Sequence, residues 1–562
     1  MGAVMDTDRK RRGRRTSLAV IGGLAVIGLG ATGLGGTGFG ETGFSGIAMA
    51  AGPAAGDGSL VLTDKGPVRG TVSADHREFL GVPYASPPVR WGSPRRAKPW
   101  TSPRDATKPG NACAQNAGFF GEKASDSEDC LYLNVTTPRR PAANGKRLPV
   151  MVWVHGSGFR NGSGALYRPT EMAVRGDVIV VTVNYRLGIF GFLDHPSLDG
   201  GPARNRSGNF GLEDQQAALR WVRSNAAAFG GDARNVTVFG ESAGGVSTCS
   251  QLTSPGAAGL FQRAIVQSGP CTVENWPDWD GTVDPSGSWL PRSRSKAERQ
   301  GQAVATRLGC PTPATAAACL RALPTSKLLK ESEYGFAPVY GGGGVLPYSP
   351  KQALREGKFA KVPVMYGMTR DEYRTFEAAQ QLMGVPPLAD EADYAARVRA
   401  YVGAEKAPKV LAQYPLRNYG SPSEAWSALV TDATFARSVT DFGQSVARRV
   451  PAYAYEFADA QAPWVADVGT PGFPTGAFHA AELQYQFDTD YFDEGRLSPA
   501  QRRLADQMTD YWTRFARTGD PNVKGAPTWQ EGNITQVLAP GKGGIQRIDF
   551  AKEHEYAFWK AL

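Results

Sequence analysis

The chain has 562 residues, of which 41% are hydrophobic and 20% charged, and these are ordinary proportions for a soluble globular protein. Its formal net charge is +9, but residues 1–50 carry six basic and three acidic side chains, so the rest of the chain holds only +6. No basic stripe with interleaved aromatic residues stands out there, which argues against a nucleic-acid partner.

The first 50 residues have the pattern of an export signal. A basic stretch runs from Arg9 to Arg15, the 25 residues from Thr16 to Gly40 are uncharged, and Ala48-Met49-Ala50 is a small-x-small cleavage site. The pair Arg14-Arg15 partly resembles a twin-arginine signal. The uncharged stretch is long enough to remain as a membrane anchor, but its nine glycines make it weakly hydrophobic. We therefore expect residues 1–50 to be cleaved and the protein to be secreted, with no stable membrane insertion afterwards.

Short apolar runs rich in β-branched residues recur along the rest of the chain, with helical patterns between them. They cover residues 148–154, 178–183, 236–239, 264–266, 362–366 and 452–455. Strands that are apolar on both faces are typical of a mostly parallel sheet covered by helices. Between the second and third runs, Leu212 to Phe229 has helical spacing and ends at Gly230-Gly231. No internal repeat is present, so we expect residues 51–562 to form one decorated α/β domain.

A serine lies between the third of these strands and a helix. The segment from Phe239 to Gly245 contains the pattern G-x-S-x-G around Ser242, and a helical pattern follows from Val246. Such a serine occupies a sharp turn that exposes its hydroxyl, and glycines two residues away let the turn pack. The pattern recurs by chance in Gly-rich chains, but the flanking strand and helix favour a nucleophile.

A glycine-rich turn follows the first strand and could supply an oxyanion hole. The segment His155-Gly156-Ser157-Gly158-Phe159 comes directly after that strand and matches the H-G-G-G type of loop with one substitution. Backbone N–H groups of Ser157 and Gly158 would then act with that of Ala243, the residue after the serine. The alternative is an ordinary turn.

A serine nucleophile needs a base, and the chain has five histidines. They are His76 between two expected hairpin strands, His155 before the glycine-rich turn, His195 in a loop, His479 after the last expected strand, and His554 in a charged C-terminal tail. In α/β-hydrolases the chain order is serine, acid, histidine, so the base belongs in a late loop. This order favours His479.

The acid should follow a strand between Ser242 and His479. The strand Val362 to Gly367 leads into a turn that contains Asp371 and Glu372, and either carboxylate could orient the imidazole. The residues by themselves leave the choice between these two open.

The chain has six cysteines, an even number that fits an exported protein with disulfides. Cys113 with Cys130 and Cys310 with Cys319 are close in sequence. Whether Cys249 and Cys271 pair or remain as buried thiols stays open. No C-x-x-C occurs and the histidines are scattered, so we expect neither a metal site nor a cofactor.

These motifs together resemble the type-B carboxylesterase family, which includes cholinesterases and bacterial para-nitrobenzyl esterases. The resemblance runs from about Val61 to Phe558. It is carried by the segments 79–85, 127–135, 208–215, 229–232 and 240–244. It implies an α/β-hydrolase fold and ester hydrolysis of small molecules.

Carried over position by position, the resemblance makes Ser242 the nucleophile and His479 the base. It selects Glu372 over Asp371 as the acid, and both short-range cysteine pairings match family disulfides. Glu241 corresponds to a glutamate beside the family's nucleophile.

The chain departs from the family pattern at three places. Ser157 replaces a glycine of the oxyanion loop, so its side chain could narrow the site while its N–H can still donate. Tyr373 and Arg374 stand where small residues are common, which could change the pocket wall. The loop from Cys113 to Cys130 lacks the tryptophan that binds cations in cholinesterases, which puts choline esters in doubt.

The sequence thus predicts a secreted serine ester hydrolase that forms an acyl-enzyme. A non-catalytic binding module on the same fold, and amide hydrolysis or acyl transfer by the same residues, are the alternatives.

The insertion after residues 264–267 contains three tryptophans, Trp276, Trp279 and Trp289. We expect this insertion to form part of the pocket rim or acyl wall, the alternative being a surface loop. The oligomeric state and the physiological substrate are left open.

Overall fold

A computed structural model describes residues 57–562, except for residues 140–145, 201–205, 270, 274–275, 279, 284–288, 333–334, 467, 490, 493–496 and 533. The expected export signal at residues 1–50 and Trp279 lie outside the described residues. Among the described residues, no helix has the length and apolar character needed to cross a membrane.

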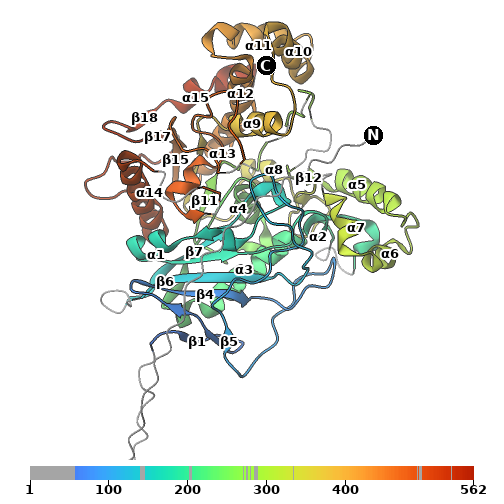
Figure 1. Ribbon diagram of the computed structural model, residues 1–562, viewed down its shortest axis with the longest axis vertical. Coiled ribbons are helices and arrows are strands. Elements are labelled where there is room, and N and C mark those ends of the chain that lie inside the picture. Colours follow the sequence, from blue (N-terminus) through green and yellow to red (C-terminus); the bar gives the residue numbers. More distant parts are fainter. Residues whose placement is uncertain are drawn as a thin grey trace, which may run out of the picture. The chain divides into compact units, whose positions relative to one another are not determined.

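The centre of the described fold is an 11-stranded sheet with the order β18-β17-β15-β14-β11-β10-β7-β9-β6-β4-β3 (Figure 1). Its strands are β3 (Thr71–Val72), β4 (His76–Pro83), β6 (Tyr132–Pro138), β7 (Leu148–Val154), β9 (Ile179–Val183), β10 (Gly231–Glu241), β11 (Arg263–Gln267), β14 (Val364–Thr369), β15 (Ala452–Phe457), β17 (Thr535–Leu538) and β18 (Ile545–Ile548). The run from β9 through β7, β10, β11, β14 and β15 to β17 is parallel. Both edges are antiparallel.

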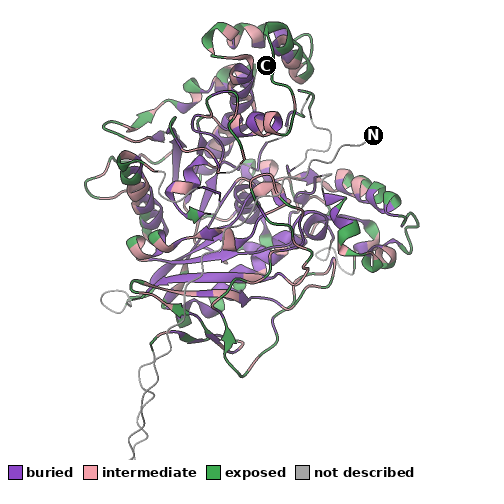
Figure 2. Cartoon of the chain, viewed as in Figure 1, coloured by how far each residue is buried: buried purple, intermediate pink, exposed green. Residues whose placement is uncertain are grey.

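The expected mostly parallel sheet is therefore present, with differences at its boundaries. Every residue of β7, β9, β14 and β15 is buried, as their continuous apolar sequences require (Figure 2). β14 begins two residues later than the sequence indicates. β15 is not the last strand, because β17 and β18 follow it. Their short, half-polar sequences give no apolar run to detect.

Helices cover both faces of the sheet, and alternate residues of each strand face different helices. On one face, Met151 and Trp153 of β7 belong to a cluster with side chains of α1 (Thr170–Gly176) and α14 (Pro499–Thr518). On the other face, Val150 and Val152 pack with side chains of α3 (Phe210–Asn225), α4 (Ala243–Thr253) and α13 (Arg437–Ala447). This layering, with helices on both faces of a mostly parallel sheet, is that of an α/β fold.

The other helices belong to insertions and to the C-terminus. They are α2 (Gly188–Phe192), α5 (Arg294–Arg307), α6 (Ala316–Ala322), α7 (Thr325–Leu329), α8 (Pro350–Arg355), α9 (Arg374–Leu382), α10 (Glu391–Val402), α11 (Ala407–Gln413), α12 (Pro422–Val430), α15 (Phe550–Glu553) and α16 (Tyr556–Ala561). Small sheets are formed by β1 (Leu60–Leu62), β2 (Pro67–Arg69) and β5 (Arg104–Asp105), by β12 (Arg292–Ser293) and β13 (Val339–Tyr340), and by β8 (Tyr167–Arg168) and β16 (Asp488–Thr489). A π-helix, Thr431–Ala436, joins α12 to α13.

Three disulfides close local loops. The structure joins Cys113 to Cys130 and Cys310 to Cys319. It also joins Cys249 to Cys271, the pair that the sequence left open. This last disulfide ties α4 to the segment after β11, and both of its cysteines are buried.

Candidate active site

Ser242 occupies the single residue between β10 and α4, in a backbone conformation that L-residues rarely adopt. Its φ is 56° and its ψ is −124°. A Cβ on Gly240 would lie 2.6 Å from the Val154 carbonyl oxygen, and one on Gly244 would lie 1.9 Å from the same atom. The Ser242 N–H donates to the Gln267 carbonyl at 3.0 Å. The two glycines therefore let the turn pack directly against β7. This packing holds Ser242 in its unusual backbone conformation, which costs about 1–3 kcal/mol of conformational free energy.

His479 lies in a loop that is bound to the turn after β14. The Asp371 N–H donates to the Ala477 carbonyl at 2.9 Å, and the Ala477 N–H donates to the Asp371 carboxylate at 2.8 Å. Thr375 Oγ1 donates to the His479 carbonyl at 3.2 Å. These hydrogen bonds hold the backbone at His479 and two residues before it, and they thereby fix the position of the imidazole.

Glu372 is fully buried beneath that imidazole. Its Oε2 makes a hydrogen bond with His479 Nδ1, and its Oε1 accepts from the Thr369 N–H at 2.9 Å. The residues by themselves left the choice of acid open between Asp371 and Glu372. In the structure Glu372 contacts His479, while Asp371 binds the backbone of the loop that carries His479.

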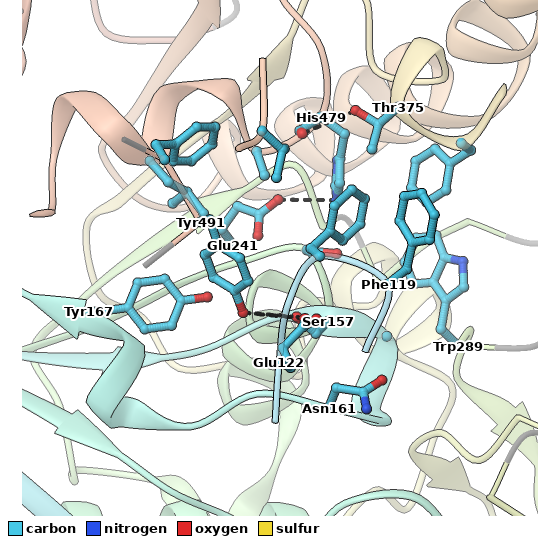
Figure 3. A pocket seen from close by; sticks show the side chains of 18 residues that line it. Phe119, Glu122, Ser157, Asn161, Tyr167, Glu241, Trp289, Thr375, His479 and Tyr491 are labelled. Atoms are coloured by element: carbon cyan, nitrogen blue, oxygen red, sulfur yellow. Dashed lines mark hydrogen bonds and ion pairs between the residues drawn. The ribbon is translucent and has the colours of Figure 1, made fainter. Parts of the chain in front are cut away.

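The other ring nitrogen, His479 Nε2, faces Glu241. The Nε2 to Glu241 Oε1 distance is 3.1 Å, and both atoms are buried without a hydrogen bond to another described residue (Figure 3). Burial raises the pKa of Glu241. Burial would lower the pKa of His479, but the carboxylates of Glu241 and Glu372 outweigh it and raise that pKa to about 9. The charge on Glu241 and the proton on His479 are therefore coupled.

The expected oxyanion loop has an unusual backbone. Ser157, Gly158 and Phe159 all have positive φ values, between 61° and 63°. Ala243 is the first residue of α4, so its N–H has no acceptor within the helix. Ser157 and Gly158 line the same cavity as Ser242.

That cavity has a volume of about 210 Å³. It is lined by Phe119, Phe120, Glu122, Ser157, Gly158, Asn161, Tyr167, Glu241, Ser242, Trp289, Thr375, Phe376, Val465, His479, Ala480, Leu483, Tyr491 and Phe492. Figure 3 shows Tyr167, Tyr491 and Glu122 on one side of it and Phe119 and Trp289 on the other. The cavity therefore has a polar side and an aromatic side.

Several side chains near the cavity differ from the sequence expectations. Tyr373 and Arg374 do not line it, because Tyr373 packs on Trp276 and Arg374 pairs with Asp371, 3.2 Å away. Trp276 packs behind Trp289, with the two ring centroids 4.9 Å apart. Glu122 and Tyr491 were not singled out by the sequence, since neither belongs to a motif.

The remaining histidines lie outside the site. Burial lowers the pKa of His155 to about 4, and its ring stacks on Tyr185 with centroids 4.5 Å apart. His554, in the charged C-terminal tail, is buried. Its two ring nitrogens each lie 2.6 Å from a carboxylate oxygen, of Asp432 and Glu456 respectively.

The place of the serine defines the class of protein. It follows a central parallel strand, begins a helix and faces a cavity with a buried histidine, which is the arrangement of the α/β-hydrolases. The chain belongs to the carboxylesterase family, whose family model matches residues 57–559.

Known relatives agree with this assignment. Over 486 residues the chain is 34% identical to para-nitrobenzyl esterase of Bacillus subtilis, covering 84% of this chain and 92% of that protein. It is 31% identical to carboxylesterase 1D of Rattus norvegicus over 86% of this chain and 88% of that protein. A solved PNB esterase structure superposes with a TM-score of 0.71 and 31% identity over 89% of this chain and 100% of that one. The chain is thus a carboxylic ester hydrolase that acts on small-molecule esters.

Proposed function

We propose that Ser242, His479 and Glu372 form the catalytic triad of an exported serine carboxylesterase. The observation that carries this proposal is the buried hydrogen bond between His479 Nδ1 and Glu372, made beside the cavity that Ser242 also lines. His479 Nε2, which lies 3.1 Å from Glu241 Oε1, is the ring nitrogen that Glu372 does not bind, and His479 lines the same cavity as Ser242. We therefore assign to Nε2 the proton transfer with the nucleophile and the substrate.

The reaction proceeds in two halves through an acyl-enzyme. His479 Nε2 takes the proton of Ser242 Oγ as that oxygen bonds to the ester carbonyl carbon, and the N–H groups of Ser157, Gly158 and Ala243 stabilise the oxyanion. The same proton then passes to the leaving alkoxide, which departs as the alcohol. Water then attacks the carbonyl carbon of the acyl-enzyme and gives a proton to His479. His479 returns this proton to Ser242 Oγ as the bond between that oxygen and the acyl carbon breaks and the carboxylic acid leaves. Glu372 stabilises the imidazolium that forms in each half.

Replacement of the nucleophile tests the triad. Ser242→Ala is expected to abolish hydrolysis of a p-nitrophenyl ester while the thermal unfolding transition is retained. A fluorophosphonate probe should label the parent protein at Ser242 and fail to label the variant. Labelling of another serine, or substantial hydrolysis by the folded variant, would overturn the assignment.

Export is the second part of the proposal, supported by the three disulfides and by the pattern of residues 1–50. Sequencing the N-terminus of the protein recovered from the culture medium should give a chain that begins just after Ala50. Recovery of the full-length chain from the cell membrane would instead support a retained anchor.

A further inference from the structure

The polar side of the cavity contains a buried acid that the proposed reaction does not use. Glu122 lies in the loop closed by the disulfide between Cys113 and Cys130, and only 4% of its surface is exposed. Ser157 Oγ donates to Glu122 Oε1 at 2.7 Å, and the Tyr491 hydroxyl donates to the same oxygen at 3.3 Å. The serine that departs from the family pattern thus binds this acid.

The Glu122 carboxylate is incompletely satisfied. Its Oε2 is buried and makes no hydrogen bond with any residue that the structure describes. No described lysine, arginine or histidine forms an ion pair with it either. A carboxylate offers about four acceptor positions, and here two hydroxyls occupy one oxygen. A buried acid without a cationic partner is costly unless something else supplies the missing charge and donor.

The position of Glu122 indicates what could supply them. Its carboxylate lies at the wall of the cavity beside Ser157, and the aromatic rings of Phe119, Phe120 and Tyr167 line the same cavity. Aromatic faces tolerate a cation. A protonated amine brings both a positive charge and an N–H donor to such a wall, whereas an alkyl group brings neither.

We propose that Glu122 is a substrate-recognition residue that selects esters carrying a protonated amine a few bonds from the ester carbonyl. This inference rests on the proposed function, because it names a substrate class for the same cavity. Ser157 and Tyr491 hold the carboxylate in place, and the amine N–H donates to it.

Matched substrates test this selection, with the amine on either side of the ester. On the alcohol side, 2-(dimethylamino)ethyl butanoate is compared with its apolar isostere 3-methylbutyl butanoate. On the acyl side, ethyl 4-(dimethylamino)butanoate is compared with ethyl 5-methylhexanoate. Hydrolysis is followed by pH-stat titration at pH 7, where the amines are protonated. The parent enzyme is expected to have the higher kcat/KM for the amine in at least one pair.

Two variants separate recognition from structure. Glu122→Gln keeps an acceptor for Ser157 and removes the charge. The ratio of kcat/KM for the amine ester to kcat/KM for its apolar isostere should therefore fall by about 10- to 100-fold. Asp126→Asn removes an exposed acid from the same loop and should leave the preference unchanged.

The outcomes distinguish the two proposals. If the parent hydrolyses the apolar esters but prefers the amine in neither pair, or if Glu122→Gln keeps the preference, the recognition role is wrong. The role is also wrong if Glu122→Gln slows both members of a pair equally, since that marks a structural residue. If the parent hydrolyses none of the four esters, or if Ser242→Ala is as active as the parent, the proposed function itself has failed.

Discussion

Asp371 and Glu372 are adjacent in the chain, and their carboxylates have different roles in the structure. Asp371 accepts from the Ala477 N–H and pairs with Arg374 near the surface. Glu372 points into the core and contacts His479. In the turn after β14 the two consecutive side chains point in opposite directions. Asp371 therefore binds the backbone of the loop before His479, and Glu372 binds the His479 imidazole.

This difference predicts unequal effects of two matched amide substitutions. Glu372→Gln retains the shape but removes the charge beside the imidazolium, and should lower kcat by about 10³- to 10⁴-fold. Asp371→Asn weakens an ion pair that does not touch the imidazole and whose side chains are partly buried, and it should lower kcat by less than about tenfold. Steady-state kinetics on one aryl ester measure both, and a larger effect at Asp371 would mean that the acid is misassigned.

The coupling of Glu241 to His479 predicts a shift in the pH profile. His479 must be neutral to accept the serine proton, so its raised pKa means that kcat/KM increases with pH up to about 9. Glu241→Gln removes the largest cause of that rise, and the midpoint should move to lower pH. Profiles of kcat/KM from pH 6 to pH 10 give the midpoints. Glu482→Gln is the comparison, because Glu482 raises the pKa of His479 less than Glu241 does. An unchanged midpoint in Glu241→Gln contradicts the coupling.

At the scale of elements, the segment after β11 contributes Trp289 to the aromatic side of the cavity. Trp276 packs against Trp289, Phe376 and Phe435, and the rings of Phe376 and Phe435 lie 5.1 Å and 5.6 Å from that of His479. Through Trp289 the segment lines the cavity, and through Trp276 it contacts the two rings beside His479.

The two tryptophans should therefore respond differently to truncation. Trp289→Ala removes a cavity wall, and should change the ratio of kcat/KM for bulky against short esters by about tenfold, which corresponds to about 1.4 kcal/mol. Trp276→Ala removes the support behind that wall, and should lower kcat/KM for all esters together. A panel of p-nitrophenyl esters of increasing acyl length gives both values. If both variants keep the parent's ratios and rates, the segment is only scaffolding.

The disulfide between Cys249 and Cys271 joins this segment to α4, the helix that begins directly after Ser242. Its cysteines are 22 residues apart, and a loop of that length predicts about 3 kcal/mol of stabilisation. The double variant Cys249→Ala/Cys271→Ala should unfold at lower denaturant concentration and show the altered ester ratios of Trp289→Ala. Peptide mapping without reductant checks the bond directly, and free thiols at both positions in the exported protein would contradict it.

At the scale of the whole molecule, the C-terminal helices are fastened to the sheet by a buried ionic cluster around His554. Asp432, from the π-helix Thr431–Ala436, and Glu456, from β15, each lie 2.6 Å from one of its ring nitrogens. Burial would lower the pKa of His554, but these two carboxylates outweigh it and raise that pKa to about 10.

This cluster predicts how stability depends on pH. The folded-state pKa of His554 is above the unfolded value of about 6.5, so its contribution is complete below that pH and is lost as the pH rises through about 10. His554→Gln should lower the free energy of unfolding by about 3–5 kcal/mol at pH 6 and by less at pH 10. Denaturant unfolding at both pH values measures the difference, with His76→Gln as the control. An equal loss at both values would mean that His554 is not charged in the fold.

The sequence predicted the parts of this molecule that depend on local patterns. The apolar strands, the turn at Ser242 and the late position of His479 each leave a signature within about ten residues. Glu122, the partners of His554 and the Cys249–Cys271 bond depend on residues brought together from distant segments. A single carboxylate or histidine has no periodicity that distinguishes a buried partner from a solvated one, so only the fold could reveal them.

The hydrogen bond from the Asp371 N–H to the Ala477 carbonyl belongs to an isolated β-bridge that pairs Asp371 with Phe478, next to His479, and this pairing affects how the enzyme folds. It joins segments more than a hundred residues apart, and contacts of such long range form late in folding because closing the intervening chain costs entropy. During refolding from denaturant, secondary structure should therefore return before the histidine and its acid meet. Recovered esterase activity would then report completion of the whole sheet, and fragments ending before His479 would fold, if at all, without activity.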